Sequence, residues 1–242
     1  MLMEHDLLPY SVSDLPEGPW LVFAPHADDE TFGMGGSLLL ASLQNIETHV
    51  VFVTDGALGG EGDHQALVEK RIQEARTATD ALGVTSIYFF AEPDRGLQVS
   101  DRLCDKISEL LAEIKPRSVF FPTPMEYHPD HRVTTELVWK SIQSLEGFTG
   151  DAYAYEISTL APINLLIDVS AVAAAKYEII KGYASQLTQA KYLALVQAID
   201  TARTFSLPMD RIAAEGFFKY ENNNGSIKEQ VMMTIPAYFE GL

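Results

Sequence analysis

The sequence predicts an α/β fold: a Rossmann-like, mostly parallel sheet with helices on both faces, built as a single domain. Two observations predict it. Short apolar runs rich in β-branched and aromatic residues alternate with longer segments of helical period, and the reactive side chains fall directly after the apolar runs. Strands that alternate with helices pair in parallel through right-handed crossovers, which place helices on both faces of the sheet.

Four apolar runs are the expected core strands. They are WLVFA, THVVFVT, SIYFF and SVFFP, at residues 20–24, 48–54, 86–90 and 118–122. Each run is short and almost continuously apolar, which is typical of strands buried on both faces. Two later runs, YAYEIST at 153–159 and NLLIDV at 164–169, indicate further strands.

Helical period marks the segments between these strands. Residues 65–82 and 103–114 each place apolar side chains three and four positions apart, which predicts amphipathic helices. A further amphipathic region, at about 171–204, supplies later helices, and another helix is expected to begin near Gly33. The tail at 222–242 carries no pattern that assigns an element.

Length and composition fit one domain. The chain has 242 residues, 47% of them hydrophobic, which is enough to bury one substantial core. We expect a single domain over residues 1–242, with a core at about 18–220 and an N-terminal extension at 1–17. No internal repeat or linker-like change in composition divides the chain. Its oligomeric state, including assembly with further identical copies, stays open.

The charge balance narrows the class of partner. There are 17 Lys and Arg residues against 34 Asp and Glu, a formal net charge of -17, so the chain repels phosphate backbones and anionic membranes at long range. Nucleic acid is therefore not an expected partner. The first residues lack a signal-peptide pattern, and no window approaches the roughly 20 apolar residues that span a bilayer. We expect a cytoplasmic protein that acts on a small molecule.

Histidine and aspartate cluster after the first and fourth expected strands. PHADDE at 25–30 follows the first strand directly, and HPDH at 128–131 lies in the segment after the fourth. Loops at the carboxyl edge of a parallel sheet share one crevice, so residues about 100 positions apart converge there. The single cysteine, Cys104, excludes a cysteine cluster. Any metal site in this crevice must therefore use imidazoles and carboxylates.

A catalytic zinc ion keeps three protein ligands and leaves one position open for water. His26, either Asp28 or Asp29, and either His128 or His131 satisfy that count. The remaining aspartate can then take a proton from the water, because neighbouring side chains in an extended turn point in different directions. Either motif alone is also typical of a helix cap or a surface turn. Their occurrence at two strand ends of one sheet favours the metal site.

With these two motifs the chain resembles the PIG-L/LmbE family of zinc-dependent N-deacetylases. The hallmark of that family is Ala/Pro-His-Pro-Asp-Asp-Glu followed much later by His-Pro-Asp-His, and Ala27 here replaces the commoner proline. The similarity covers most of residues 20–220. It includes Thr54-Asp55-Gly56, Arg71 with Glu74, Lys176, Tyr183-Ala184-Ser185-Gln186 and Ala214-Glu215. The resemblance implies a metal-dependent hydrolase that removes an N-acetyl group from an amino-sugar substrate such as an N-acetylglucosamine derivative.

The resemblance also implies a role for each motif residue. Asp28 is the implied general base, and His128 is the implied cationic or acidic group beside the developing oxyanion. Asp130 is implied to orient a catalytic imidazole. One Zn²⁺ per chain is implied, although other divalent metals such as iron or cobalt suit the same donors. The implied metal ligands are His26, Asp29 and His131.

Two residues outside the motifs are implied substrate contacts. A family arginine that matches Arg71 reaches the sugar or its attached group, and Asp94 matches a position that binds sugar hydroxyls. A salt bridge between Arg71 and Glu74 is an alternative interpretation of the same pair. Glu126 and Tyr127 directly precede His128, but the sequence does not say which way they point. The glycines at 59–62 predict a mobile loop near the site.

Two other functions stay open at this point. The same zinc chemistry cleaves other amides, such as a thiol conjugate, and a sugar-binding module can hold a metal without turnover. Asp28 beside a complete ligand set favours hydrolysis, because a binding module has no need of a base.

Overall fold

One mixed sheet of eight strands forms the centre of the molecule. The computed structural model describes residues 8–221, 225–230 and 232, and the sheet order within them is β1-β7-β8-β6-β5-β2-β3-β4. The strands are β1 (Ser11–Val12), β2 (Trp20–Ala24), β3 (Thr48–Thr54), β4 (Ser86–Glu92), β5 (Ser118–Pro122), β6 (Asp151–Tyr155), β7 (Leu165–Asp168) and β8 (Ala214–Tyr220).

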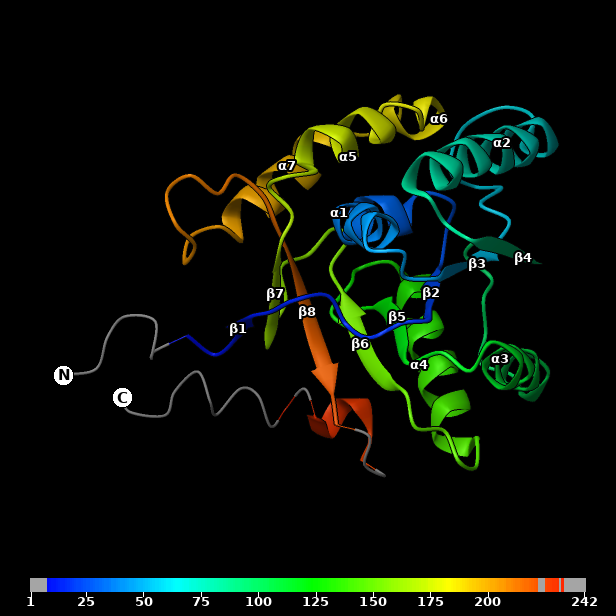
Figure 1. Cartoon of the computed structure of the whole chain (residues 1–242). Coiled ribbons are helices and arrows are strands. Elements are labelled where there is room, and N and C mark those ends of the chain that lie inside the picture. The colour runs from blue at the N-terminus through cyan, green and yellow to red at the C-terminus, as the bar shows by residue number, and fades with distance from the viewer. Residues whose placement is uncertain (1–7, 222–224, 231, 233–242) are drawn as a thin grey trace.

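Helices cover both faces of this sheet, as Figure 1 shows. One layer holds α1, α2, α5, α6 and α7, and the other holds α3 and α4. The predicted α/β class, with a mostly parallel sheet and helices on both faces, is confirmed. The helices are α1 (Asp29–Leu43), α2 (His64–Leu82), α3 (Asp101–Ile114), α4 (Pro129–Ser144), α5 (Ala173–Ile180), α6 (Ala184–Leu187) and α7 (Tyr192–Ala202).

The central strands are apolar throughout because both of their faces are buried. In β2, Trp20 and Val22 pack into the core beneath α1 and α2, whereas Leu21 and Phe23 pack into the core beneath α3 and α4. All four side chains have no exposed surface. Each β2 side chain therefore stabilises one of two separate cores, at about 1.5–3 kcal/mol for full burial of such a side chain.

The strand order changes direction between β2 and β5. β2 pairs in parallel with both strands beside it, β3 and β5. The chain extends the sheet from β2 through β3 to β4 on one side, and from β5 to β6 on the other. A crevice opens at such a reversal because the following connections leave in opposite directions. The segments after Ala24 and Pro122 therefore lie next to each other at the same sheet edge.

Some elements differ from those predicted. The strand predicted at 153–159 ends at Tyr155, whereas the region at 171–204 supplies later helices as predicted, namely α5 to α7. The sequence period did not reveal α4, which begins inside the HPDH motif. It also did not reveal β8, which runs antiparallel between β6 and β7 and so breaks the strand-helix alternation.

Helix α1 begins at Asp29, earlier than Gly33, and the glycines lie inside it. They allow α1 to approach β6 closely. A Cβ atom on Gly33 would overlap the Tyr155 ring and lie 2.5 Å from the Glu156 carbonyl oxygen. The intrinsic cost of glycine in a helix is thus offset by close packing.

A buried ionic network fixes the middle of α1. Glu215 of β8 accepts hydrogen bonds from the backbone N–H groups of Gly36 and Ser37, at 2.7 and 2.8 Å. The ammonium of Lys176, from α5, lies 2.8 Å from Glu215 and 2.9 Å from Asp200 of α7. Lys176, Asp200 and Glu215 are all buried, and this pairing is what makes their burial tolerable. Helix α1 is therefore held by three later elements.

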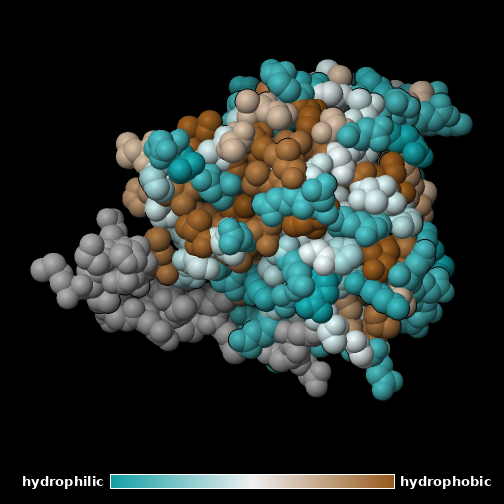
Figure 2. Space-filling model, viewed as in Figure 1, coloured by the Kyte–Doolittle hydropathy of each residue, from teal (hydrophilic) through white to brown (hydrophobic). Residues whose placement is uncertain are grey.

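The surface is mixed in character. Figure 2 shows hydrophobic residues gathered over the α5 and α7 region, with hydrophilic residues around them. Among the described residues, no helix is long and apolar enough to cross a membrane.

Candidate active site

Three donor atoms from the two motifs form a nearly equilateral triangle. His26 Nδ1 lies 3.2 Å from Asp29 Oδ2 and 3.2 Å from His131 Nε2, and the third side, from His131 Nε2 to Asp29 Oδ2, is 3.3 Å. Ligands about 2.0–2.1 Å from a tetrahedral zinc ion are separated by about 3.3–3.4 Å. The donor types and their spacing therefore fit a divalent metal ion. The three residues are 4–8% exposed, so the set opens only to the crevice.

The first turn of α1 supplies two carboxylates that point in different directions. Asp29 supplies one corner of the triangle through Oδ2, which also accepts a hydrogen bond from the His26 backbone N–H at 2.8 Å. Asp28 occupies the N-cap position, but its side chain makes no capping hydrogen bond. It lies instead 3.3 Å from Arg71. Asp28 is thus an N-cap by position only, and its carboxylate lines the crevice.

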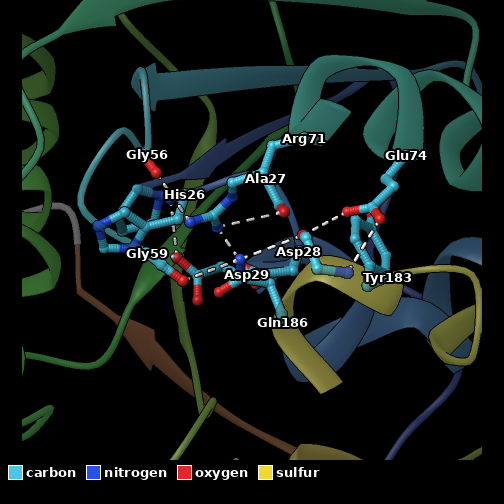
Figure 3. Close-up of polar contacts among 12 residues, drawn as sticks. His26, Ala27, Asp28, Asp29, Gly56, Gly59, Arg71, Glu74, Tyr183 and Gln186 are labelled. Atoms are coloured by element: carbon cyan, nitrogen blue, oxygen red, sulfur yellow. Dashed lines mark hydrogen bonds and ion pairs between the residues drawn. The ribbon is translucent and has the colours of Figure 1, made fainter. Parts of the chain in front are cut away.

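Arg71 reaches from α2 to the loop after β2, as Figure 3 shows. Its guanidinium donates to Asp28 at 3.3 Å and to the carbonyl oxygen of Gly56 at 3.2 Å. The alternative salt bridge to Glu74 is not formed, because Glu74 accepts hydrogen bonds from Ser185. Arg71 lines the cavity; its two terminal nitrogens are paired within the site, whereas its buried Nε has no hydrogen-bond partner, and a contact with substrate stays a prediction.

The second ring nitrogen of His26 faces two carboxylates. Asp94 Oδ1 and Asp130 Oδ2 each lie 3.4 Å from His26 Nε2. Both are held in turn, since Asp94 accepts from the Leu58 N–H at 2.9 Å and Asp130 from the Arg95 N–H at 2.7 Å. A ring N–H directed at a carboxylate leaves the opposite nitrogen with its lone pair free for a metal. The Asp130 carboxylate lies closer to His26, at 3.4 Å, than to His128, at 3.9 Å, so the imidazole that it is placed to orient is that of His26.

His128 stands outside the triangle but touches its members. Its ring centroid lies 4.6 Å from that of His26 and 5.2 Å from that of His131. Nδ1 accepts the backbone N–H of Asp130 at 3.2 Å, as the N-cap of α4. In the neutral ring the proton is then on Nε2, so His128 presents a hydrogen-bond donor. Its side chain is 32% exposed and lines the cavity, where a substrate can meet it.

Charges in the crevice shift the pKa values strongly. Burial alone lowers the pKa of His26, but Asp130, Asp29 and Asp94 outweigh it and raise the pKa well above its usual value. Burial likewise lowers the pKa of His131, which Asp29 and Glu126 raise to about 9. The carboxylates thus favour positive charge at the position of the triangle.

The pKa values of Asp28 and His128, the two catalytic candidates, shift in the opposite direction from those of an ordinary ion pair, because burial dominates at both. Burial raises the pKa of Asp28 to about 7, against the opposing effect of Arg71. Burial, together with the positive charge of His26 and His131, lowers the pKa of His128. Asp28 is thus the more basic of the two motif aspartates, because burial is opposed at Asp29 by both imidazoles, which lower the pKa of that carboxyl.

A cavity of about 640 Å³ opens above the triangle. Its inner wall is the metal-binding set with Asp28, Arg71 and Asp94. Its outer wall carries the charged Glu61 and Arg95 together with aromatic and uncharged polar side chains, among them Tyr127, Ser158, Gln186, Gln189 and Tyr192. Tyr127 is 78% exposed at the rim.

The structure brings together all eight residues predicted for the site. Sequence reasoning did not predict the direction of Glu126, which is 1% exposed and lies behind His131, away from the cavity. It also did not assign Ser158, Gln189 or Tyr192 to the cavity wall. His64 holds the loop that begins at Gly56 through the Ala57 carbonyl oxygen and is not part of the cavity wall. His5 lies outside the described residues.

Comparison with known proteins places this site in a family. Residues 21–142, half of the chain, match the family described as PIG-L, GlcNAc-PI de-N-acetylase. The chain belongs to this family. The matched segment contains both motifs, and with them every residue of the triangle.

Two curated relatives are named as deacetylases. The chain is 30% identical over 118 residues to a diacetylchitobiose deacetylase of Thermococcus kodakarensis, covering 46% of this chain and 44% of that protein. It is 25% identical over 134 residues to a protein of Bacillus cereus named as a probable N-acetyl-alpha-D-glucosaminyl L-malate deacetylase, covering 52% and 61%. The matches thus span about half of each relative.

The fold is shared over a longer stretch with a solved structure. The N,N'-diacetylchitobiose deacetylase of Pyrococcus horikoshii, complexed with an inhibitor, superposes with a TM-score of 0.75 at 25% identity. The likeness covers 83% of this chain and 83% of that one.

Proposed function

We propose that the protein is a zinc-dependent N-deacetylase that hydrolyses the N-acetyl group of an amino-sugar-containing small molecule. The observation that carries the proposal is the triangle of His26, Asp29 and His131 with Asp28 beside it. A donor set of this spacing fits zinc, and the extra carboxylate supplies a base. The family and the relatives named as deacetylases support the same reaction.

His26, Asp29 and His131 would hold one zinc ion per chain. When bound, zinc supplies Lewis acidity toward a carbonyl oxygen and toward water. Asp29 also lies in the first turn of α1, where the positive end of the helix dipole stabilises its charge.

Asp28 is placed to move the proton in this reaction. Its carboxylate takes a proton from the attacking water, the water oxygen bonds to the amide carbon, and the carbon–nitrogen bond breaks. The amine nitrogen takes the proton, so the products are acetate and the free amine. Arg71 holds Asp28 at 3.3 Å and fixes its direction during these transfers.

His128 is placed to stabilise the charge that develops on the amide oxygen. Because Nδ1 accepts the Asp130 backbone N–H, Nε2 is the donor. A donor that is already oriented costs no reorganisation when the negative charge forms. This role agrees with the position of His128 outside the triangle and in the cavity wall.

The outer wall of the cavity favours a sugar over other acylated amines. Aromatic faces pack against the C–H face of a sugar ring, and the amide oxygens of Gln186 and Gln189 offer acceptors to hydroxyl groups. The cavity of about 640 Å³ leaves space beyond the reacting group for the rest of such a substrate. Asp94 also lines the cavity and is placed to meet a sugar hydroxyl: its Oδ2 accepts the Leu58 N–H, whereas its Oδ1 faces His26 and has no hydrogen-bond partner.

The first experiment is metal analysis combined with a free-amine assay. The substrate panel contains N-acetylglucosamine, diacetylchitobiose and N-acetylglucosaminyl malate, with an N-acetylated amino acid as the non-sugar control. We expect one metal per chain, with amine release that stops on chelation and returns with zinc. Metal binding without amine release from any member would favour a binding module, and release from the non-sugar control alone would favour another amide.

A further inference from the structure

Glu126 is a buried carboxylate for which the proposed reaction gives no use. It is 1% exposed and lies in the loop between β5 and α4, two residues before His128. Its two oxygens contact different parts of the site. Oε1 accepts the backbone N–H groups of Ile157, Ser158 and Thr159, at 3.0, 2.9 and 3.3 Å. Oε2 accepts the Ser158 hydroxyl.

Oε2 also faces the imidazole of His131. The distance from Oε2 to His131 Nδ1 is 3.6 Å, longer than a hydrogen bond. His131 Nδ1 is nonetheless buried and has no hydrogen-bond partner. A buried N–H without an acceptor is costly, and Glu126 is the carboxylate paired with this nitrogen. A movement of a few tenths of an ångström closes the gap.

The other imidazole of the triangle shows the same arrangement. His26 turns Nδ1 toward the triangle and Nε2 toward Asp94 and Asp130. His131 turns Nε2 toward the triangle and Nδ1 toward Glu126. In both rings a carboxylate stands behind the nitrogen that faces away from the donor triangle.

We propose that Glu126 is a positioning residue that fixes the tautomer and direction of His131 and, through residues 157–159, the adjacent wall of the cavity. The inference rests on the proposed function, because it takes His131 as a metal ligand. Ile157 and Ser158 line the cavity, so one buried carboxylate connects the metal-binding set to the surface that a substrate meets.

Glu126→Gln separates the two contacts. The Gln amide oxygen can still accept the three backbone N–H groups of residues 157–159. Its NH₂ group then replaces Oε2, and it meets Nδ1–H of His131 as a second donor. The loop is retained while the contact with His131 becomes repulsive. Partners behind a metal-binding histidine typically change metal affinity by about 10–100-fold.

Glu156→Gln is the matched control. Glu156 is also buried and also fixes this loop, through the Ala161 N–H and Arg203, but it is paired with Arg203 rather than with His131. Removal of the Glu156 carboxylate charge therefore disturbs the end of the 157–161 segment at Ala161. A purely structural role for Glu126 predicts the same effect from both variants.

The test measures zinc dissociation constants on the full chain by competition with a chromophoric chelator. His131→Ala gives the loss expected when a ligand is removed. We expect Glu126→Gln to weaken zinc binding by about 10–100-fold, and Glu156→Gln to leave it close to wild type. NMR of ¹⁵N-labelled His131 gives a second readout: the zinc-loaded wild type should carry its proton on Nδ1, and Glu126→Gln should shift that signal.

The outcomes separate this inference from the proposed function. If His131→Ala loses zinc but Glu126→Gln binds it as tightly as Glu156→Gln does, the positioning role of Glu126 is overturned and the ligand set stands. If His131→Ala itself keeps wild-type zinc affinity, the proposed ligand set is overturned as well. Should Glu126→Gln fail to fold, Glu126→Asp replaces it, with Glu156→Asp as control. The shorter carboxylate should weaken zinc binding only at position 126.

Discussion

His26 Nδ1 and His131 Nε2 lie 3.2 Å apart although the two residues are 105 positions apart in the chain. The contact exists because β2 and β5 are neighbours in the sheet while their following segments leave in opposite directions. The site is therefore a property of the strand order, and its two halves have no local contact that would form it earlier.

Replacement of Asp28 by Asn tests the base. The Asn side chain keeps an oxygen for Arg71 but cannot take a proton, so kcat should fall by roughly 10²-fold or more. Zinc content should stay at the wild-type level because Asp28 is outside the triangle. Turnover at the wild-type rate in a zinc-loaded Asp28→Asn protein would remove Asp28 from this role.

The two histidines of the HPDH motif should respond differently to alanine substitution. His131→Ala should lose metal and activity together, because it removes a corner of the triangle. His128→Ala should retain metal and lose turnover, since its ring contacts the cavity. Elemental analysis and kcat on the same samples distinguish the two. Loss of stoichiometric zinc in His128→Ala would contradict this division.

Close packing of α1 on β6 predicts an unequal response of two glycines. Gly33→Ala places a methyl group against Tyr155 and the Glu156 carbonyl and should lower the free energy of unfolding by about 1–3 kcal/mol. Gly35→Ala is the control, since a Cβ atom there would lie 3.3 Å from Cγ of Lys176, a contact that a shift of a few tenths of an ångström relieves. Urea denaturation should show Gly35→Ala close to wild type. Equal losses at both positions would mean that helix packing is not the cause.

The buried network beneath α1 predicts a pH dependence of stability. Burial raises the pKa of Asp200 to about 6, partly offset by Lys176. The unfolded carboxyl titrates near 4, so the folded state binds this proton more tightly. The stability that Asp200 contributes is complete below pH about 4 and is lost as the pH rises through about 6.

Comparison with Asp200→Asn isolates that contribution, because Asn does not titrate. Between pH 4 and 7 the free energy of unfolding of the wild type should fall relative to the variant by about 2–3 kcal/mol. Urea denaturation of both proteins across this range provides the measurement. Parallel curves would show that Asp200 has an ordinary pKa.

Much of this architecture follows from patterns in the sequence. The period of the apolar runs predicted β2, β3 and β5 with their observed bounds, because strands buried on both faces have little freedom in composition. The convergence of the two motifs followed from parallel-sheet geometry alone.

Other features depend on contacts that no local pattern records. The direction of Glu126 is decided by three backbone N–H groups about 30 residues later, and Arg71 is paired with Asp28 rather than with nearby Glu74. The reversal of β8 is likewise decided by its partners, β6 and β7. The sequence alone does not distinguish a buried glutamate such as Glu126 from a glutamate on the surface.

The network of Lys176, Asp200 and Glu215 has a consequence for biosynthesis. Every proposed zinc ligand has been translated by residue 131, but the groups that secure the helix carrying Asp29 arrive much later in the chain. A growing polypeptide therefore exposes the ligands before they can be held in register. Any metal ion that bound at that stage would meet donors that are not yet fixed, because α1 gains its contacts with Glu215 only when β8 has joined the sheet.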